Sequence, residues 1–237
     1  MISRLFLSSR VVAALLISVC FAISSPVRAE TTISDQDLVY LASYGKTKAG
    51  QLFIQIRQTE NGYLVTSTTK PSKLAGLLVK EHSTEARFGW RDGKLVPENA
   101  VEALKGKDSY DRGYTFDYEN MTISLAEGKS STFSEEDQFE SVTYPLLLMH
   151  REIESIEGLE VKEVGPKRLR DYTYAKPEAE TIKVPAGEFS TWKVTRYRTD
   201  KPEDTVTTWL DQSDNPVPVK IVVTKDGKPS ILDLSSN

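Results

Sequence analysis

The chain has 237 residues, of which 30 are lysine or arginine and 34 are aspartate or glutamate, so its net charge at neutral pH is −4. An acidic surface is a poor partner for nucleic acid and for anionic lipid headgroups, which argues against both kinds of surface binding. The sequence contains one cysteine, so a disulfide scaffold and a cysteine-based metal site are excluded.

The first 29 residues have the pattern of a secretory signal peptide. Arg4 and Arg10 give a positive start, residues 11–24 form an apolar run, and small residues lead to a cleavage point after Ala29. A membrane-spanning helix needs roughly 20 apolar residues, so this run is short for a span. We therefore expect cleavage after Ala29, a periplasmic location and a mature chain without a transmembrane anchor.

The mature chain, residues 30–237, is expected to form one β-rich domain. Cys20 leaves with the signal peptide, and Val19 before it argues against lipoprotein processing, which favours a smaller residue there. The remaining residues show no repeat, linker or second long apolar stretch. A chain of this size should bury roughly 70% of its unfolded surface, which is enough for one core. No cofactor and no metal are expected.

Polar and apolar residues alternate along most of the mature chain, which is typical of half-buried strands. Asn61-Gly62, Asp92-Gly93 and Asp226-Gly227 each separate two alternating runs, and both residues of such a pair tolerate the positive φ of a type I′ hairpin turn. These turns favour antiparallel neighbours. The predicted strands are 37–46, 51–58, 63–69, 86–90, 94–97, 113–118, 121–126, 159–165, 168–176, 180–184, 190–198, 205–211, 218–225 and 228–234.

Residues 134–154 depart from this alternation and predict the main helix. Ser134 and Asp137 resemble a capping box at its start, and Pro145 inside it predicts a break or kink. The apolar residues recur three or four positions apart, as on one helical face: Phe139, Val142, Leu146, Met149 and Ile153.

The fold class expected from these elements is mainly β. A flat sheet of about a dozen strands would curl, because strand twist accumulates across it. We therefore predict a strongly curved antiparallel sheet, as a half-barrel or open barrel, packed against the one helix.

Several stretches together carry a resemblance to a known family. They are "LVYLASYGKTKAGQLFIQI" (38–56), "FGWRDGKLVPENA" (88–100), "DQFESVTYPLLLMHREI" (137–153) and "IKVPAGEFSTWKVTRY" (182–197). With these motifs the chain resembles an exported bacterial family known as domain of unknown function 3108, over about residues 36–234. In outline that family is similar to periplasmic lipoprotein carriers, and this similarity of fold implies a lipid or lipoprotein held on a concave sheet face.

Six apolar side chains are candidates for lining such a groove. In the hairpin around Pro185 and Gly187, the aromatic residues follow directly on the return strand. The alternative is that the same side chains fill the core, since aromatic residues dominate cores. The candidates are Phe139, Tyr144, Met149, Phe189, Trp192 and Trp209.

Other polar residues have both a structural and a functional interpretation. Asp117 and Glu119 would share one strand face, either as the acid/base pair of a carbohydrate hydrolase or as part of a charged outer face. His150 is predicted at the end of the helix and His82 in a solvated loop, so neither indicates catalysis.

Two charged clusters are expected to be solvated. One acidic cluster lacks the spacing of a Ca²⁺ loop and is interpreted as helix capping: Glu135, Glu136, Asp137 and Glu140. One basic run is interpreted as the guard of a strand edge, with contact to an anionic lipid or sugar as the alternative: Lys167, Arg168 and Arg170.

The sequence thus predicts an exported, non-enzymatic cell-envelope protein that binds a lipid or a lipidated or hydrophobic partner in the groove of a curved sheet. One alternative is a module that binds another envelope protein without a small ligand. The other is a carboxylate-dependent hydrolase of envelope carbohydrate.

Overall fold

The computed structural model describes residues 32–45, 47–72, 81–104, 110–141 and 144–236, so the predicted signal peptide lies outside the described residues. Main-chain contacts divide the chain into two units, Met1–Glu30 and Thr31–Asn237. All described residues belong to the second unit.

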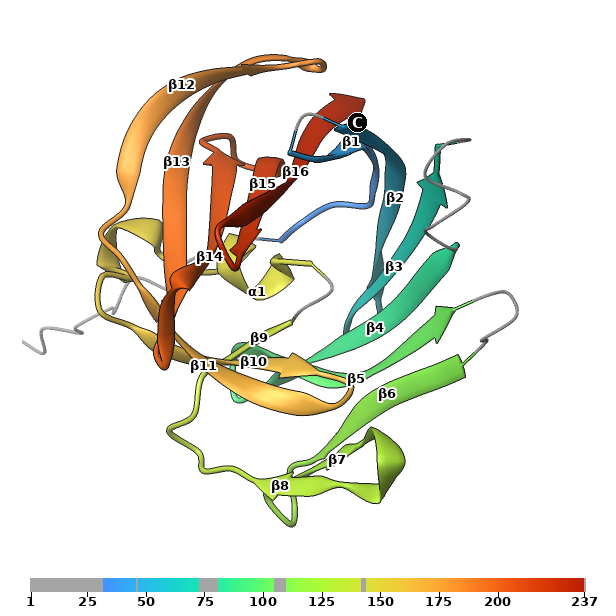
Figure 1. Ribbon diagram of the computed structural model, residues 1–237. Coiled ribbons are helices and arrows are strands. Elements are labelled where there is room, and N and C mark those ends of the chain that lie inside the picture. The colour runs from blue at the N-terminus through green and yellow to red at the C-terminus, as the bar shows by residue number, and fades with distance from the viewer. Residues whose placement is uncertain (1–31, 46, 73–80, 105–109, 142–143, 237) are drawn as a thin grey trace, which may run out of the picture. The chain divides into compact units, whose positions relative to one another are not determined.

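The described residues are mainly β, as the alternation predicts, and form one sixteen-stranded sheet (Figure 1). The remaining elements are one short helix, α1 (Leu146–Met149), and 3₁₀ turns at Ala126–Gly128 and Ile153–Ser155. The strands are β1 (Gln36–Tyr44), β2 (Thr47–Thr59), β3 (Gly62–Pro71), β4 (His82–Arg91), β5 (Lys94–Leu104), β6 (Tyr110–Asp117), β7 (Thr122–Leu125), β8 (Ser130–Thr132), β9 (Phe139–Ser141), β10 (Glu160–Gly165), β11 (Arg168–Tyr174), β12 (Glu178–Val184), β13 (Gly187–Arg198), β14 (Lys201–Asp211), β15 (Pro218–Lys225) and β16 (Lys228–Ser236).

The strands follow one another in the order β8-β7-β6-β5-β4-β3-β2-β1-β16-β15-β14-β13-β11-β10-β9, and β12 pairs with β13 beside this path. Neighbours are antiparallel except β9 and β10, which run parallel. The ladder therefore begins at β8 and stops at β9, so the sheet is not closed into a barrel by main-chain pairing.

The predicted hairpin turns form, although one differs in detail. Asp92 and Gly93 have φ of 49° and 71°, and Asp226 and Gly227 have φ of 50° and 71°, as a type I′ turn requires. At the Asn61-Gly62 turn, by contrast, Gly62 is already the first residue of β3.

Gly62 pairs with Gly89 of β4 and has a φ of 152°. A Cβ atom placed on it would lie 2.0 Å from the carbonyl oxygen of Phe88. The glycine thus permits a close approach of the β3 and β4 main chains.

The helix predicted over 134–154 is wrong for the described residues, while Val142 of its predicted face lies outside them. Phe139–Ser141 form β9 instead, and all three residues are buried, so this segment has no solvated helical face. Pro145 precedes α1 directly and cannot donate a main-chain hydrogen bond, and α1 is a single turn with all four residues buried. Asp137 does accept a hydrogen bond from the Ser134 amide at 2.9 Å, but this contact closes a turn rather than a helix start.

The strands near the two ends of the sheet contact each other. β9 contacts β5, and β10 contacts β6, without a ladder between them (Figure 1). Phe116 of β6 packs its ring against Phe139 of β9, with ring centroids 4.9 Å apart, and against Phe133 at 5.5 Å. Phe116 also stacks on Tyr118 at 5.3 Å. We call these four residues the aromatic seam.

Candidate ligand cavity

A cavity of about 230 Å³, called here the main cavity, lies among strands β10, β11 and β13–β16, Ser141 and the segment 144–148. About half of its lining residues are aliphatic or aromatic, while four basic and two acidic side chains also reach it. Its apolar lining includes Tyr144, Leu148, Val194, Val206, Ile221 and Leu232.

The register of the sheet explains why these residues face the same space. Val194 of β13 lies opposite Thr208 of β14, Thr208 lies opposite Ile221 of β15, and Ile221 lies opposite Leu232 of β16. Residues directly opposite one another in an antiparallel sheet point to the same face. All four line the cavity, so one cross-strand row of the sheet forms its wall.

A buried ion-pair cluster lies in the polar part of the lining. Glu163 is 4% exposed and Arg196 is 8% exposed. Arg196 Nη2 donates a hydrogen bond to Glu163 Oε2 at 2.7 Å, and Arg170 Nη1 donates one to Glu163 Oε1 at 3.0 Å. Burial is the largest single influence on Arg196 and would lower its pKa, but the surrounding acidic groups, Glu163 first among them, together outweigh it, so the pKa lies above its usual value. Arg196 is therefore charged inside the protein.

A second buried carboxylate extends this cluster. Glu140 of β9 is 0% exposed and accepts hydrogen bonds at Oε1 from the Tyr174 hydroxyl at 3.1 Å and from Arg151 Nε at 3.3 Å. Burial, together with the nearby Glu140 charge, raises the pKa of Tyr174 well above its usual value. The Tyr174 hydroxyl therefore keeps its proton and acts as a donor.

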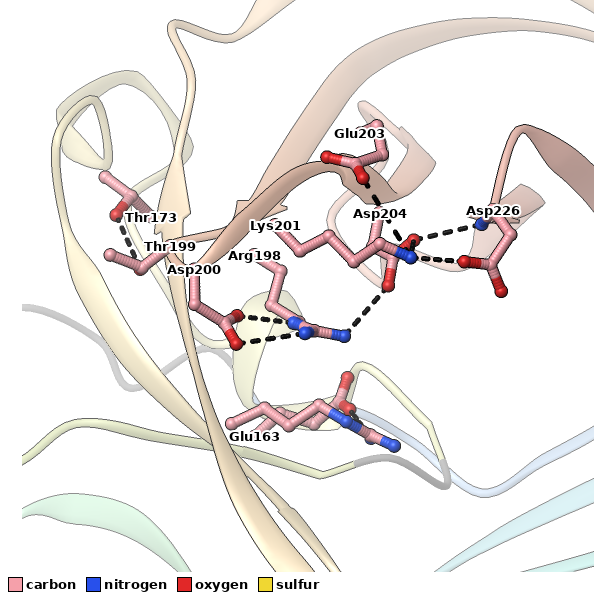
Figure 2. Close-up of polar contacts among 10 residues, drawn as sticks. Glu163, Thr173, Arg198, Thr199, Asp200, Lys201, Glu203, Asp204 and Asp226 are labelled. Carbon is pink, nitrogen blue, oxygen red and sulfur yellow. Dashed lines mark hydrogen bonds and ion pairs between the residues drawn. The ribbon is translucent and has the colours of Figure 1, made fainter.

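At the turn between β13 and β14, a set of ion pairs borders the cavity (Figure 2). Arg198 donates to Asp204 through Nη1 at 2.9 Å and to Asp200 through Nη2 at 2.9 Å. Asp204 also accepts a hydrogen bond from the main-chain amide of Asp226 at 3.0 Å, and this bond is the main reason why its pKa is lowered. Lys201 Nζ lies 3.2 Å from Asp204. These contacts fix the position of Arg198 beside the cavity.

Neither histidine is among the residues that line the main cavity. Within the described part of the chain, no group of three or more histidine, cysteine, aspartate or glutamate side chains is placed to hold a metal ion. Among the same residues, no helix is both long and apolar enough to cross a membrane.

The structure does not bring the six predicted groove residues together. Tyr144 lines the main cavity, and Phe139 lines a second cavity of about 380 Å³ beside the aromatic seam. Met149 is buried in the core. Phe189, Trp192 and Trp209 are partly buried and pack against the core.

Trp192 and Trp209 lie on opposite faces of the sheet. Trp192 is paired with the buried Leu210, whereas Trp209 is paired with Lys193, the next residue along β13. The Trp209 indole donates a hydrogen bond to Glu180, and Lys220 lies over its ring. A single groove cannot contain both tryptophans.

The predicted acid/base pair does not share a strand face. β6 ends at Asp117, and Glu119 lies in the following turn. Asp117 accepts hydrogen bonds from the Glu119 and Asn120 amides at 3.1 and 3.0 Å, and these contacts lower its pKa, with the hydrogen bond from the Asn120 side chain contributing most. Asp117 therefore caps a turn.

Three further predictions need correction. His82 was expected in a solvated loop, but it begins β4 and its Nε2 lies 2.6 Å from Glu102. Glu140 was expected on a solvated helix, but β9 buries it completely. Arg170 was expected at a solvated edge, but it reaches the main cavity, because Arg170, Tyr172 and Tyr174 share one face of β11.

The charged residues of the cavity were not predicted, because charged side chains were assigned to the outer face of the sheet. The alternation of residues along β13 nevertheless indicates which of its charged side chains face the core. In "STWKVTRYR", Trp192, Val194, Arg196 and Arg198 occupy every second position, and the apolar members of this series identify it as the core face.

Comparisons with known proteins agree with this fold. A model of the family described as "Protein of unknown function (DUF3108)" matches residues 39–228, which confirms the resemblance inferred from the motifs. No curated protein matches the chain. The crystal structure of a beta-barrel-like protein of domain of unknown function DUF1849 from Brucella abortus is similar, with a TM-score of 0.54 and 9% identity over 86% of this chain and 97% of that chain. At this identity the likeness concerns the fold alone.

Proposed function

Since the chain belongs to the DUF3108 family, whose function is unknown, we propose a function from the main cavity. The protein is an exported, non-enzymatic binding protein of the cell envelope, and it holds a lipid or another hydrophobic molecule. The export part of the proposal rests on the signal-peptide pattern of residues 1–29 and places the mature protein in the periplasm.

The observation that carries the proposal is an apolar cavity inside the sheet. Its volume of about 230 Å³ corresponds to roughly eight water-sized groups. Pockets for small molecules usually enclose about 300–1,000 Å³, so this cavity suits one hydrocarbon chain better than a lipid with several chains. The size therefore favours a single-chain ligand or one chain of a larger lipid.

We further infer that the sheet is strongly curved and forms an open half-barrel, with α1 on its concave side. The contacts of β9 with β5 and of β10 with β6 support this geometry, as does the burial of all four residues of α1. The beta-barrel-like description of the DUF1849 protein is consistent with it. In this geometry the main cavity opens on the concave side of the sheet.

A cavity-filling substitution tests the function. Val206 of β14 lines the main cavity, whereas Val222 of β15 lies outside the set of lining residues. In a Val206→Phe variant the added ring should occupy the cavity and exclude the ligand, while a Val222→Phe variant should retain it. Native mass spectrometry of protein purified from the envelope fraction, followed by solvent extraction of any bound molecule, measures both.

Thermal unfolding of the two variants provides the control for folding. Filling an existing cavity should cost less than the roughly 1–3 kcal/mol typical of overpacking a full core. If wild-type protein carries no hydrophobic molecule and takes up none from an envelope extract, the binding function is wrong.

A protein–protein module without a small ligand is the second candidate, and the placement of β12 favours it. β12 pairs with β13 along seven residues, Glu178–Val184, and lies outside the main strand order. A strand paired on one side can add a strand from a partner. A pull-down from the envelope that recovers one stoichiometric partner, with no hydrophobic molecule, would favour this function.

A further inference from the structure

We propose that the ligand of the main cavity is a single-chain amphiphile with an anionic headgroup, and that Arg170 and Arg196 bind that headgroup. This inference rests on the proposed function and adds the chemical class of the ligand.

The first argument is the hydrogen-bonding capacity of the two guanidinium groups. Each carries five N–H donors. Within the described residues, Arg170 and Arg196 each donate one hydrogen bond to a different oxygen of the same carboxylate, Glu163. One carboxylate therefore bridges two guanidinium groups, and donors remain on both of them for a further oxygen anion.

The second argument is charge. The lining of the main cavity contains Arg170, Arg196, Arg198 and Lys225, against Glu163 and Asp204. The chain as a whole is acidic, so this local excess of positive charge is opposite in sign to the rest of the protein. Arg196 is buried, whereas Arg170 and Arg198 are partly exposed and Lys225 is exposed, so the excess of positive charge lies on the part of the lining that solvent reaches. Beside the aliphatic walls, it is complementary to a ligand with an apolar chain and a negative end.

The third argument is the position of the cations. Arg196 is 8% exposed, and its guanidinium lies over the Tyr172 ring at 4.9 Å. A fixed, poorly hydrated guanidinium binds carboxylate or phosphate oxygens in a defined geometry. Leu148 and Val194 line the same cavity, so a chain attached to the bound headgroup can lie along them.

The experiment compares two ligands that share one chain and differ in charge, decanoate and decanol, by calorimetric titration of the delipidated mature protein. Decanoate should bind at least about tenfold more tightly than decanol, since a hydrogen bond to a charged group contributes roughly one decade or more in affinity.

Variants then assign the preference to the arginines. Arg170 is the better choice for substitution, because it is partly exposed and its loss leaves Glu163 paired with Arg196. Arg170→Gln should weaken decanoate about tenfold and leave decanol unchanged, whereas Arg170→Lys should lose less. Arg87→Gln, which removes an exposed arginine of β4 far along the strand order from β11, should change neither affinity.

The outcomes separate this inference from the proposed function. If neither decanoate nor decanol binds, both are overturned. If the two ligands bind equally well, or decanol binds more tightly, the apolar site stands and the anionic headgroup is overturned. If decanoate is preferred and Arg170→Gln retains the full preference, the assignment to these arginines is overturned.

Discussion

At the scale of single residues, the molecule is notable for polar groups on the inward face of its sheet. Glu140 and Glu163 lie on adjacent strands in parallel register and both are buried. Burying a carboxylate costs several kcal/mol unless charged partners and hydrogen bonds compensate it. Arg151 and Tyr174 bind one, and Arg170 and Arg196 bind the other. Such an arrangement contributes little to net stability. Glu163 lines the main cavity, which is consistent with the binding role proposed above.

The buried tyrosines predict a loss of stability at alkaline pH. Burial raises the pKa of Tyr114 to about 12, and it raises the pKa of Tyr40 and Tyr144 as well. In the unfolded chain these hydroxyls ionise near pH ~10. Below that pH their contribution to stability is complete, and it is lost as the pH rises toward the folded pKa.

Free energies of unfolding in urea, measured between pH ~8 and pH ~12, test this prediction. The expected loss for Tyr114 alone is about 2 kcal/mol by the pH at which its folded-state pKa is reached. A Tyr114→Phe variant should show a correspondingly smaller loss. A flat profile over this range would contradict the burial of these hydroxyls.

At the scale of elements, Gly62 illustrates how one residue sets the pairing of two strands. In a Gly62→Ala variant the new Cβ would lie 2.0 Å from the Phe88 carbonyl oxygen, so β3 and β4 must separate. We expect a destabilisation of more than about 2 kcal/mol, from this clash and the strained backbone together. Gly93→Ala is the matched control, because its Cβ would meet nothing within 4 Å.

The Gly93→Ala variant retains only the strain of a φ of 71°, which costs on the order of 1 kcal/mol. Chemical denaturation of both variants measures the difference. Equal effects would mean that the close approach of β3 and β4 has no energetic consequence.

Most strands could be predicted from the sequence because alternation is a local signal that persists when a strand has one buried face. Residues 134–154 failed because their apolar spacing fits a helix, while the tertiary pairing of Phe139–Ser141 with β10 decides the structure. The register also separates Trp192 from Trp209, which no local pattern reveals. The charged cavity residues needed the same long-range information, since charge alone favours the outer face.

At the scale of the second unit, Thr31–Asn237, the ends of the sheet are joined outside the strand ladder, by aromatic packing and by contacts such as the hydrogen bond from the Ala126 amide to the Pro166 carbonyl at 2.8 Å. The ladder stops at β9, and the aromatic seam fills the junction between β6 and β9. Aromatic pairs with centroids about 5 Å apart contribute both burial and edge-to-face attraction.

A Phe116→Ala variant tests this role of the seam. Phe116 contacts the Tyr118, Phe133 and Phe139 rings, so its truncation should cost about 3–5 kcal/mol. The exposed Val101→Ala on β5 should cost less than about 1 kcal/mol.

Hydrogen exchange then locates the change that Phe116→Ala causes. Because β9 has strand pairing only with β10, the amides of this pair, such as Lys162 N–H bonded to the Gln138 carbonyl at 2.8 Å, should exchange faster in the variant. The β2–β3 ladder, which lies in the middle of the sheet, should be protected until global unfolding. Uniformly faster exchange at both places would mean that the seam is an ordinary part of one cooperative core.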